Sequence, residues 1–220
     1  MHSLFNLDVF RAMIPFTSKD QARYYLGGVY VTIDNDGATY VATDGNVLAA
    51  YRDNMPAEGG NMVLGSWIIP ASVLPMLPKK PKRGYDWEPR VSLCLADGDN
   101  RLELYCPSNT VNIVPIDGTY PDWKRVLPSV KLPSIKEDDK TIPFVDPRKA
   151  VKVLDFAEAL ELTNTLQPNY FGPESPVVYT FPDAPAFCIV MPMRRHAVGD
   201  WDIPAWAQLS LTQKRQKEHK

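Results

Sequence analysis

The stretch DGTYPDWKRVLP, Asp117 to Pro128, divides the sequence into two β-rich parts. It contains Pro121 and Pro128. Proline fixes φ, supplies no backbone N–H and biases the preceding residue towards extended backbone. We therefore expect a rigid, extended connector here rather than a helix. A stiff connector between two β-rich units can form one wall of a groove, and we expect the function to lie in that groove.

The part before the connector shows the same order of elements twice. Residues 7–16 have apolar side chains at helical spacing and predict a helix, which Pro15 ends or kinks. Asp-Gly pairs at 44–45 and 97–98 predict tight hairpins, because glycine accepts the positive φ that such turns require. The expected strands are 26–33, 39–43, 47–51, 62–69, 90–96, 101–106 and 110–116, with a second short helix over 71–77.

A third copy of this order follows the connector. Asp146 and Pro147 are typical of a helix N-terminus and predict a helix to about residue 160. Strands are expected over 141–145, 162–167, 177–181 and 186–193. Three β-α-β-β-β modules predict an α+β protein with helices on one face of antiparallel sheets. The expected division is 1–127 as a complete domain of two such halves, 128–140 as linker, 141–195 as a half domain and 196–220 as a polar tail.

Composition narrows the class of protein. The net charge of −2 argues against a protein that coats nucleic acid indiscriminately, although it allows a local basic face. No apolar run approaches the ~20 residues needed to span a bilayer, and the N-terminus lacks a secretory pattern. The three cysteines, Cys94, Cys106 and Cys188, lie far apart in strand-like stretches. We expect buried free thiols, hence a reducing, cytoplasmic compartment.

Catalytic and metal-binding patterns are not found in the sequence. It has no glycine-rich phosphate loop, no His/Cys cluster at zinc spacing and no nucleophile elbow. The acidic pairs Asp34/Asp36 and Asp97/Asp99 fall in predicted hairpin turns, where turn chemistry explains them more simply than a metal site does. We expect no enzyme, no metal and no cofactor.

Four stretches together carry a family resemblance. They are RYYLGGV (23–29), ATDGNVLA (42–49), DGTYPDWKRVLP (117–128) and VMPMR (190–194). In order and spacing they resemble the bacterial DNA polymerase III beta subunit, the beta sliding clamp. The resemblance implies a DNA-clamp fold with helices facing DNA, and it covers the family's middle domain and the second half of its third domain. The family's first domain and the first half of its third have no counterpart, so a ring would need several chains.

The resemblance also implies a peptide-binding groove between the two modules. Clamps bind peptides of the QLxLF type there. Carried over by position, the groove would be lined by Leu26, Thr43, Gly45, Asn46, Val47, Leu48, Pro121, Arg125, Val126, Val190, Met191, Pro192, Met193 and Arg194. The alternative is that these are ordinary core residues. Asn46-Val47 stands where the family has His-Arg, so the rim loses positive charge.

Two further groups of residues are candidates for binding. The residues that would face DNA are Lys79, Lys80, Lys82, Arg83, Arg148, Lys149 and Lys152; the alternative is a solvated surface. In the tail, Gln208, Leu209, Ser210 and Leu211 read like the start of a clamp-binding motif without its final aromatic residue. We hypothesise that the tail occupies the groove of its own chain or of a neighbour; the alternative is a solvated chain end.

Three functions remain open from the sequence. The first is a replication processivity factor that tethers polymerase to double-stranded DNA, as a homo-oligomer. The second is a non-encircling adaptor or decoy that binds the polymerase and other proteins with clamp-binding motifs. The third is a structural relic without a working groove. Neither composition nor motifs suggest a membrane partner.

Overall fold

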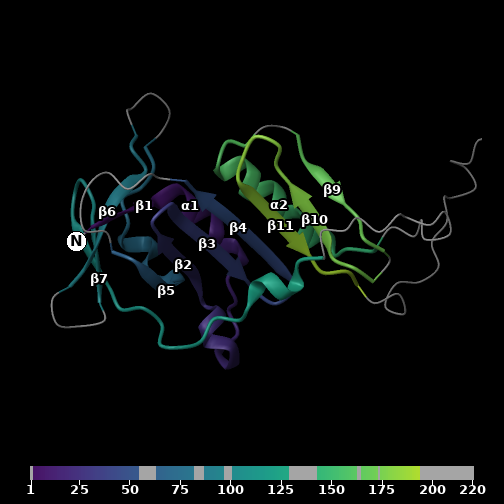
Figure 1. Ribbon diagram of the computed structural model, residues 1–220, viewed down its shortest axis with the longest axis horizontal. Coiled ribbons are helices and arrows are strands. Elements are labelled where there is room, and N and C mark those ends of the chain that lie inside the picture. The colour runs from purple at the N-terminus through teal and green to yellow at the C-terminus, as the bar shows by residue number, and fades with distance from the viewer. Residues whose placement is uncertain are drawn as a thin grey trace, which may run out of the picture.

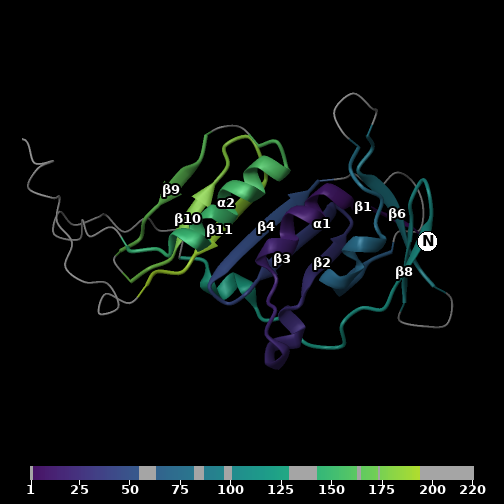
Figure 2. The same ribbon diagram turned by 180° about the vertical axis from the view of Figure 1, so that it is seen from behind.

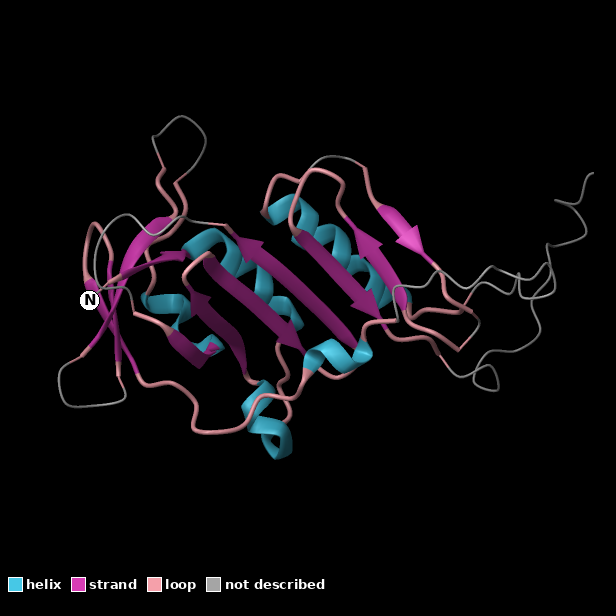
Figure 3. Cartoon of the chain, viewed as in Figure 1, coloured by secondary structure: helices cyan, strands magenta, loops and turns pink. Residues whose placement is uncertain are grey.

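The computed structural model describes residues 2–54, 63–81, 87–96, 101–128, 143–162, 165–172 and 174–193. In these ranges the chain forms two antiparallel sheets, one of four strands and one of seven (Figures 1 and 3). The described ranges contain no helix long and apolar enough to cross a membrane. The fold class expected from the sequence, α+β with antiparallel sheets, is confirmed.

The elements occur in the following places. The four-stranded sheet has the order β1 (Ser3–Asn6), β6 (Arg90–Leu95), β7 (Leu102–Tyr105), β8 (Thr110–Ile113). The seven-stranded sheet has the order β5 (Gly65–Pro70), β2 (Gly28–Asp34), β3 (Gly37–Thr43), β4 (Val47–Asp53), β11 (Ala186–Val190), β10 (Val177–Thr180), β9 (Gln167–Asn169). The helices are α1 (Leu7–Met13) and α2 (Pro147–Ala159), with 3-10 helices η1 (Ile14–Phe16), η2 (Gln21–Leu26), η3 (Ala71–Met76) and η4 (Trp123–Val126).

The first two modules exchange their opening strands. Strand β1 begins the first module but pairs with β6 of the second, with Ser3 opposite Leu93. Strand β5 begins the second module but pairs with β2 of the first, with Gly28 opposite Pro70. Each sheet therefore contains strands of both modules, and neither sheet is complete without the other module.

The third module extends the sheet of the first through an antiparallel pair, β4 with β11. Val47 lies opposite Val190 and Leu48 opposite Ile189. Because side chains alternate along a strand, these two pairs point to opposite faces of the sheet. Val47 and Val190 belong to the core on the helix side, whereas Leu48 and Ile189 belong to a second cluster on the other face.

The helices α1 and α2 lie side by side on one face of the long sheet (Figure 2). Each starts at a side-chain cap: the Asn6 side-chain oxygen Oδ1 accepts from the backbone N–H of Val9, and the Asp146 carboxylate accepts from that of Arg148. Phe156 of α2 packs between rings of the first and third modules, with centroids 5.8 Å from Phe16 and 5.7 Å from Phe181. The helix layer therefore joins the modules as the sheet does.

The structure differs from the sequence-based expectation at several element ends. Strand β1 was not expected, because four residues are too few to show an alternating pattern. The helix expected over 7–16 changes to 3-10 geometry at Ile14, where Pro15 removes an N–H donor, and the one expected over 71–77 is the 3-10 helix η3, which contains Pro75. Residues 143–145 form no strand, and the strand expected over 162–167 begins only at Gln167.

Replacing Phe156 by alanine should remove the packing between α2 and the other modules. The Phe156 side chain is 1% exposed. Truncation of a buried phenylalanine leaves a cavity and should lower the free energy of unfolding by about 3–5 kcal/mol. Chemical denaturation followed by circular dichroism measures this. Leu154→Ala is the matched control on the same helix: its side chain is 57% exposed, and a loss as large as that of Phe156→Ala would contradict the packing described.

Candidate functional site: the groove at the junction of two modules

The face of the long sheet opposite the helices carries an apolar floor where β4 meets β11. We call Leu48, Ala50, Phe187 and Ile189 the junction floor. Leu48 and Ala50 come from β4, Phe187 and Ile189 from β11, and all four belong to one apolar cluster with Leu26. Backbone pairing across the junction is completed beyond the strand ends by the Met191 N–H, which donates to the Asn46 carbonyl at 2.8 Å. The floor is therefore shared between two modules.

The connector 117–128 lies against this floor and forms one wall. Its Trp123 ring is 6.2 Å from Phe187, and its Tyr120 ring stacks on Tyr30 at 4.8 Å with planes 4° apart. Burial raises the pKa of the Tyr120 hydroxyl. The expectation of an extended connector without a helix is wrong for Trp123–Val126, which form the 3-10 helix η4. Val126 remains exposed at the end of η4.

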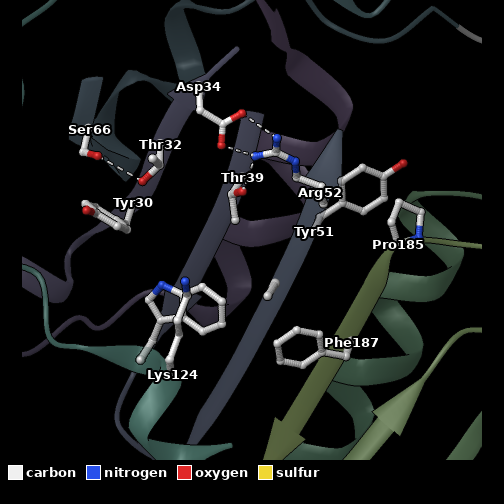
Figure 4. A pocket seen from close by; sticks show the side chains of 12 residues that line it. Tyr30, Thr32, Asp34, Thr39, Tyr51, Arg52, Ser66, Lys124, Pro185 and Phe187 are labelled. Atoms are coloured by element: carbon white, nitrogen blue, oxygen red, sulfur yellow. Dashed lines mark hydrogen bonds and ion pairs between the residues drawn. The ribbon is translucent and has the colours of Figure 1, made fainter. Parts of the chain in front are cut away.

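A hollow of about 490 Å³ opens beside the floor (Figure 4). One end is apolar, with Ala50, Trp123 and Phe187. The other end is polar: the Arg52 guanidinium donates to both Asp34 carboxylate oxygens, at 2.6 and 2.8 Å. The hydrogen bond from Arg52 is the main cause that lowers the pKa of Asp34 to about 2. The hollow thus offers a ligand an apolar end and a fixed ion pair.

The turn between β3 and β4 is held by the carboxylate of Asp44. Asp44 is 9% exposed and accepts from the backbone N–H groups of Asn46 and Val47 at 2.8 and 3.0 Å. Lys149 and Lys152 of α2 donate to its other oxygen at 2.9 and 3.0 Å. The carboxylate therefore joins the turn of the first module to the helix of the third.

The ionisation of Asp44 follows from these contacts. Its partial burial alone would raise the pKa. The hydrogen bonds from Lys149, from the Asn46 and Val47 backbone and from Lys152 outweigh that effect and hold the pKa of Asp44 well below its usual range. Asp44 is therefore charged at neutral pH, and its single negative charge is shared by two lysines.

Gly45 next to Asp44 has a backbone angle that favours glycine. Its φ is +89°, a conformation that residues with a side chain rarely adopt. A Cβ atom would also lie 2.6 Å from the Arg23 Nη1 atom, which donates to the Asp44 carbonyl oxygen at 3.0 Å, so that the flexible Arg23 side chain would have to move.

The structure places the expected groove residues in different surroundings. Leu26 and Leu48 lie in the cluster of the junction floor, and the Thr43 hydroxyl is used within the Asp44 turn. The expectation that Val47 and Val190 line the groove is wrong. Their side chains are 1% and 0% exposed in the core on the helix side, because the pleat turns them away from the floor. Exposed or half-exposed near the junction are Gly45, Asn46, Pro121, Arg125, Val126, Met191, Pro192 and Met193. Arg194 lies outside the described residues.

Sequence reasoning missed three side chains of this site: Trp123, Phe187 and Ile189. A signal for two of them was present, because Phe187 and Ile189 alternate with Val190 along one strand-like run. Once Leu48 is placed opposite Ile189, alternation assigns Ile189 rather than Val190 to the floor. The pairing itself joins residues far apart in the sequence and could not be read from it.

Most of the expected DNA-facing cations are already paired. Lys80 lies 3.4 Å from the Asp8 carboxylate and 3.1 Å from that of Glu161. Lys149 and Lys152 are bound to Asp44, as described above. Arg148 pairs with Asp146 but its side chain is 88% exposed, and Lys79 is exposed.

Two other sets of candidate residues require comment. Lys82 and Arg83, and the tail residues Gln208, Leu209, Ser210 and Leu211, lie outside the described residues. Among the residues that the structure describes, no group of His, Cys, Asp or Glu side chains could hold a metal ion. In the first of the acidic turns, Asp34 accepts from the Asp36 backbone N–H at 2.9 Å, as turn chemistry predicts.

Known proteins share both sequence and fold with this chain. Curated beta sliding clamps of two Caulobacter vibrioides strains are 32% identical over 115 residues, 50% of this chain and 29% of theirs. The chain therefore matches less than a third of the length of these relatives. No protein-family model matches the chain.

Solved structures extend the likeness to most of the chain. The DNA polymerase III beta subunit of Thermotoga maritima is 18% identical, with a TM-score of 0.62 over 88% of this chain and 65% of its own. The sliding clamp of Bacillus subtilis is 14% identical, with a TM-score of 0.63 over 88% of this chain and 64% of its own. At such identities the likeness shows the fold alone.

The chain has a DNA-clamp fold. This fold is defined by exchanged opening strands, antiparallel sheets and a helix layer on one side, and an apolar groove lies where two modules join. The chain is similar in sequence to bacterial beta sliding clamps over half of its length, and its fold is similar to theirs over most of it.

Replacing Asp44 by asparagine should weaken the junction. Both lysines would lose their carboxylate partner, and loss of such charge-assisted hydrogen bonds should cost roughly 1–3 kcal/mol of the free energy of unfolding at pH 7. The pKa of Asp44 is lower in the folded chain than in the unfolded one, so its contribution is complete above about pH 4 and is lost as pH falls through the folded value. Urea titrations at several pH values measure both effects.

The control for this variant is Asp36→Asn in the exposed β2–β3 turn. It removes the same charge from the surface and should change the free energy of unfolding by less than about 0.5 kcal/mol. Equal effects of the two variants, or an unchanged acid dependence in Asp44→Asn, would show that Asp44 does not join the modules.

Proposed function

We propose that this chain is a clamp-like DNA-replication protein that binds short peptides of partner proteins at the junction groove. The observation that carries the proposal is the hollow where two modules join, whose apolar end is formed by Ala50, Trp123 and Phe187 beside the buried residues of the junction floor. Val126 on the wall and Met191 just after β11 are each 39% exposed, although both are apolar. Exposed apolar side chains beside a hollow with an apolar end are typical of a peptide-binding site.

The groove favours peptides with leucine and phenylalanine anchors. Each fully buried side chain of this kind contributes about 1.5–3 kcal/mol. Met191 and Met193 have flexible thioether chains that can fill the space around such anchors. Asn46 is uncharged, so the rim attracts acidic peptides less than a rim with His-Arg would. Peptides of the QLxLF type fit these requirements.

The partners that follow are a DNA polymerase and other replication proteins with such motifs, acting in the cytoplasm. A binding surface of this kind is what a non-catalytic processivity factor requires. The solved clamp of Bartonella birtlesii, 18% identical, is bound to griselimycin, so one protein of this fold binds a ligand.

Val126→Asp and Met191→Asp should each weaken binding of a labelled QLxLF-type peptide by at least about tenfold, a loss of ~1.4 kcal/mol, because a carboxylate would be desolvated by the bound anchor. Fluorescence anisotropy measures the affinity. Val151→Asp on α2 is the matched control, since Val151 is 50% exposed on the opposite side of the sheet. Equal affinity of all three variants and the unmodified chain would refute the groove.

A second function, a non-encircling adaptor, is favoured by the state of the cations on the helix side. Lys80, Lys149 and Lys152 are each bound to carboxylates. Phosphates would have to compete with Asp8, Asp44 and Glu161 for them. A helix face neutralised in this way attracts DNA weakly, whereas the groove on the other face is unaffected.

DNA binding measured against salt concentration distinguishes the two functions. A ring that uses these lysines should show a steep dependence, with a slope of about −0.9 per phosphate contacted. The adaptor should show a shallow slope of log affinity against log salt concentration. Arg148 is the most exposed described cation of α2, so Arg148→Glu should reduce the steepness of that slope by the equivalent of at most one phosphate contact. Anisotropy measures the binding of duplex DNA at low and moderate salt. Binding of the QLxLF-type peptide checks that the groove is intact.

A further inference from the structure

The three modules place equivalent strands at equivalent positions in their sheets. In each module three strands form a meander, and its last strand is β4, β8 or β11. The orders β5-β2-β3-β4 and β1-β6-β7-β8 are the same arrangement in the two sheets. The second edge of strand β4 pairs with β11, the equivalent strand of another module. Strand β8 pairs with β7 on one side only, within the described part of the chain.

The backbone of β8 is directed so that its free edge can pair. The Cys106 N–H donates to the Asn109 carbonyl at 2.9 Å, and hydrogen-bonded pairs alternate from there along the β7–β8 ladder. Val111 and Ile113 therefore direct their backbone groups to β7. Thr110 and Asn112 direct theirs outwards, as Leu48 and Ala50 of β4 direct theirs to β11.

Strand β8 is short, at four residues, which itself limits edge pairing, but its composition gives no further protection. Sheet edges are also commonly guarded by charged residues, proline or bulges. Residues 110–114, TVNIV, include none of the charged types and no proline, and Val114 is 66% exposed. Half-exposed Met76 ends the 3-10 helix η3 beside this edge, where its carbonyl accepts from the Asn109 side chain at 3.1 Å. The edge is thus uncharged, and the exposed side chains within β8 are the polar Thr110 and Asn112.

The other end of the molecule differs. Strand β9 ends the long sheet, and Figure 2 places it at the end of the molecule opposite to β8. It is three residues long and carries Pro168 at its centre. Proline removes a backbone donor, so β9 is a poor partner for β8 of another chain. Head-to-tail pairing, which would build a ring or a filament, is thereby disfavoured.

We propose that β8 pairs antiparallel with β8 of a second copy of this chain, which gives a two-fold symmetric dimer with one continuous sheet of eight strands. The β4–β11 junction provides the template, since it joins equivalent strands of two modules in the same antiparallel manner. A strand without charges can lie opposite itself without like-charge repulsion. The joint differs from the β4–β11 junction on its outer face, where Thr110 and Asn112 stand in place of Leu48 and Ala50, so it forms no second apolar groove.

Analytical ultracentrifugation of the full chain tests this dimer. The expected mass is about twice 24.7 kDa at micromolar concentration. Asn112→Pro removes an outward N–H without touching the β7 ladder and should give a monomer, whereas Asn112→Ala should remain dimeric. Circular dichroism verifies folding, and binding of the QLxLF-type peptide should be equal in all variants, so that failure of the dimer is distinct from failure of the groove.

A charge-swap experiment keeps the proposal testable if the proline variant does not fold. On the register of the β4–β11 junction, Asn112 lies opposite Thr110 of the other copy, so the two residues 112 lie diagonally across the two-fold axis on one face of the sheet. Asn112→Lys and Asn112→Glu should each be monomeric because these like charges repel, and a mixture of the two should restore the dimer. An unmodified chain that is monomeric, or that forms a larger ring, would overturn the proposal. So would a dimer that persists in Asn112→Pro, or a mixture of the charged variants that stays monomeric.

Discussion

The antiparallel pairing of β4 with β11 is the constraint on which the site depends. It brings Leu48 and Ile189, from distant parts of the sequence, opposite each other on one face of a single sheet. On the other face Phe156 packs between rings of two modules, and at the strand end Asp44 binds two lysines of α2. Backbone pairing, ring packing and the salt bridges of Asp44 thus all stabilise the same joint.

The same joint explains why basic residues of a helix need not indicate contact with DNA. Lys149 and Lys152 lie on α2, yet both are used to neutralise Asp44 between the modules. Their sequence pattern, a helix with cations off its apolar face, is identical for a phosphate-binding surface and for an internal brace. What distinguishes them is a carboxylate more than a hundred residues away in the chain.

Particular residues show which parts of the fold and of the site could be predicted from the sequence. The helix capped by Asp146 was predicted to within one residue of its end, because capping and helical spacing are local properties. The family segments 42–49 and 190–194 include residues of both strands of the β4–β11 junction. The exchange of β1 and β5 between sheets and the assignment of Val190 to the helix side were not predicted, because strand partners are set by pairing across the chain and not by local pattern.

Methyl-labelled NMR of the full chain, titrated with a peptide that carries leucine and phenylalanine anchors, tests the junction groove most directly. The methyl groups of Leu48, Ile189, Val126 and Met191 should shift together and saturate at one affinity, while those of Val47 and Val190 on the helix side should shift less. Shifts that centre on the helix side, or no saturable shifts at the four groove residues, would show that the junction floor is only internal packing.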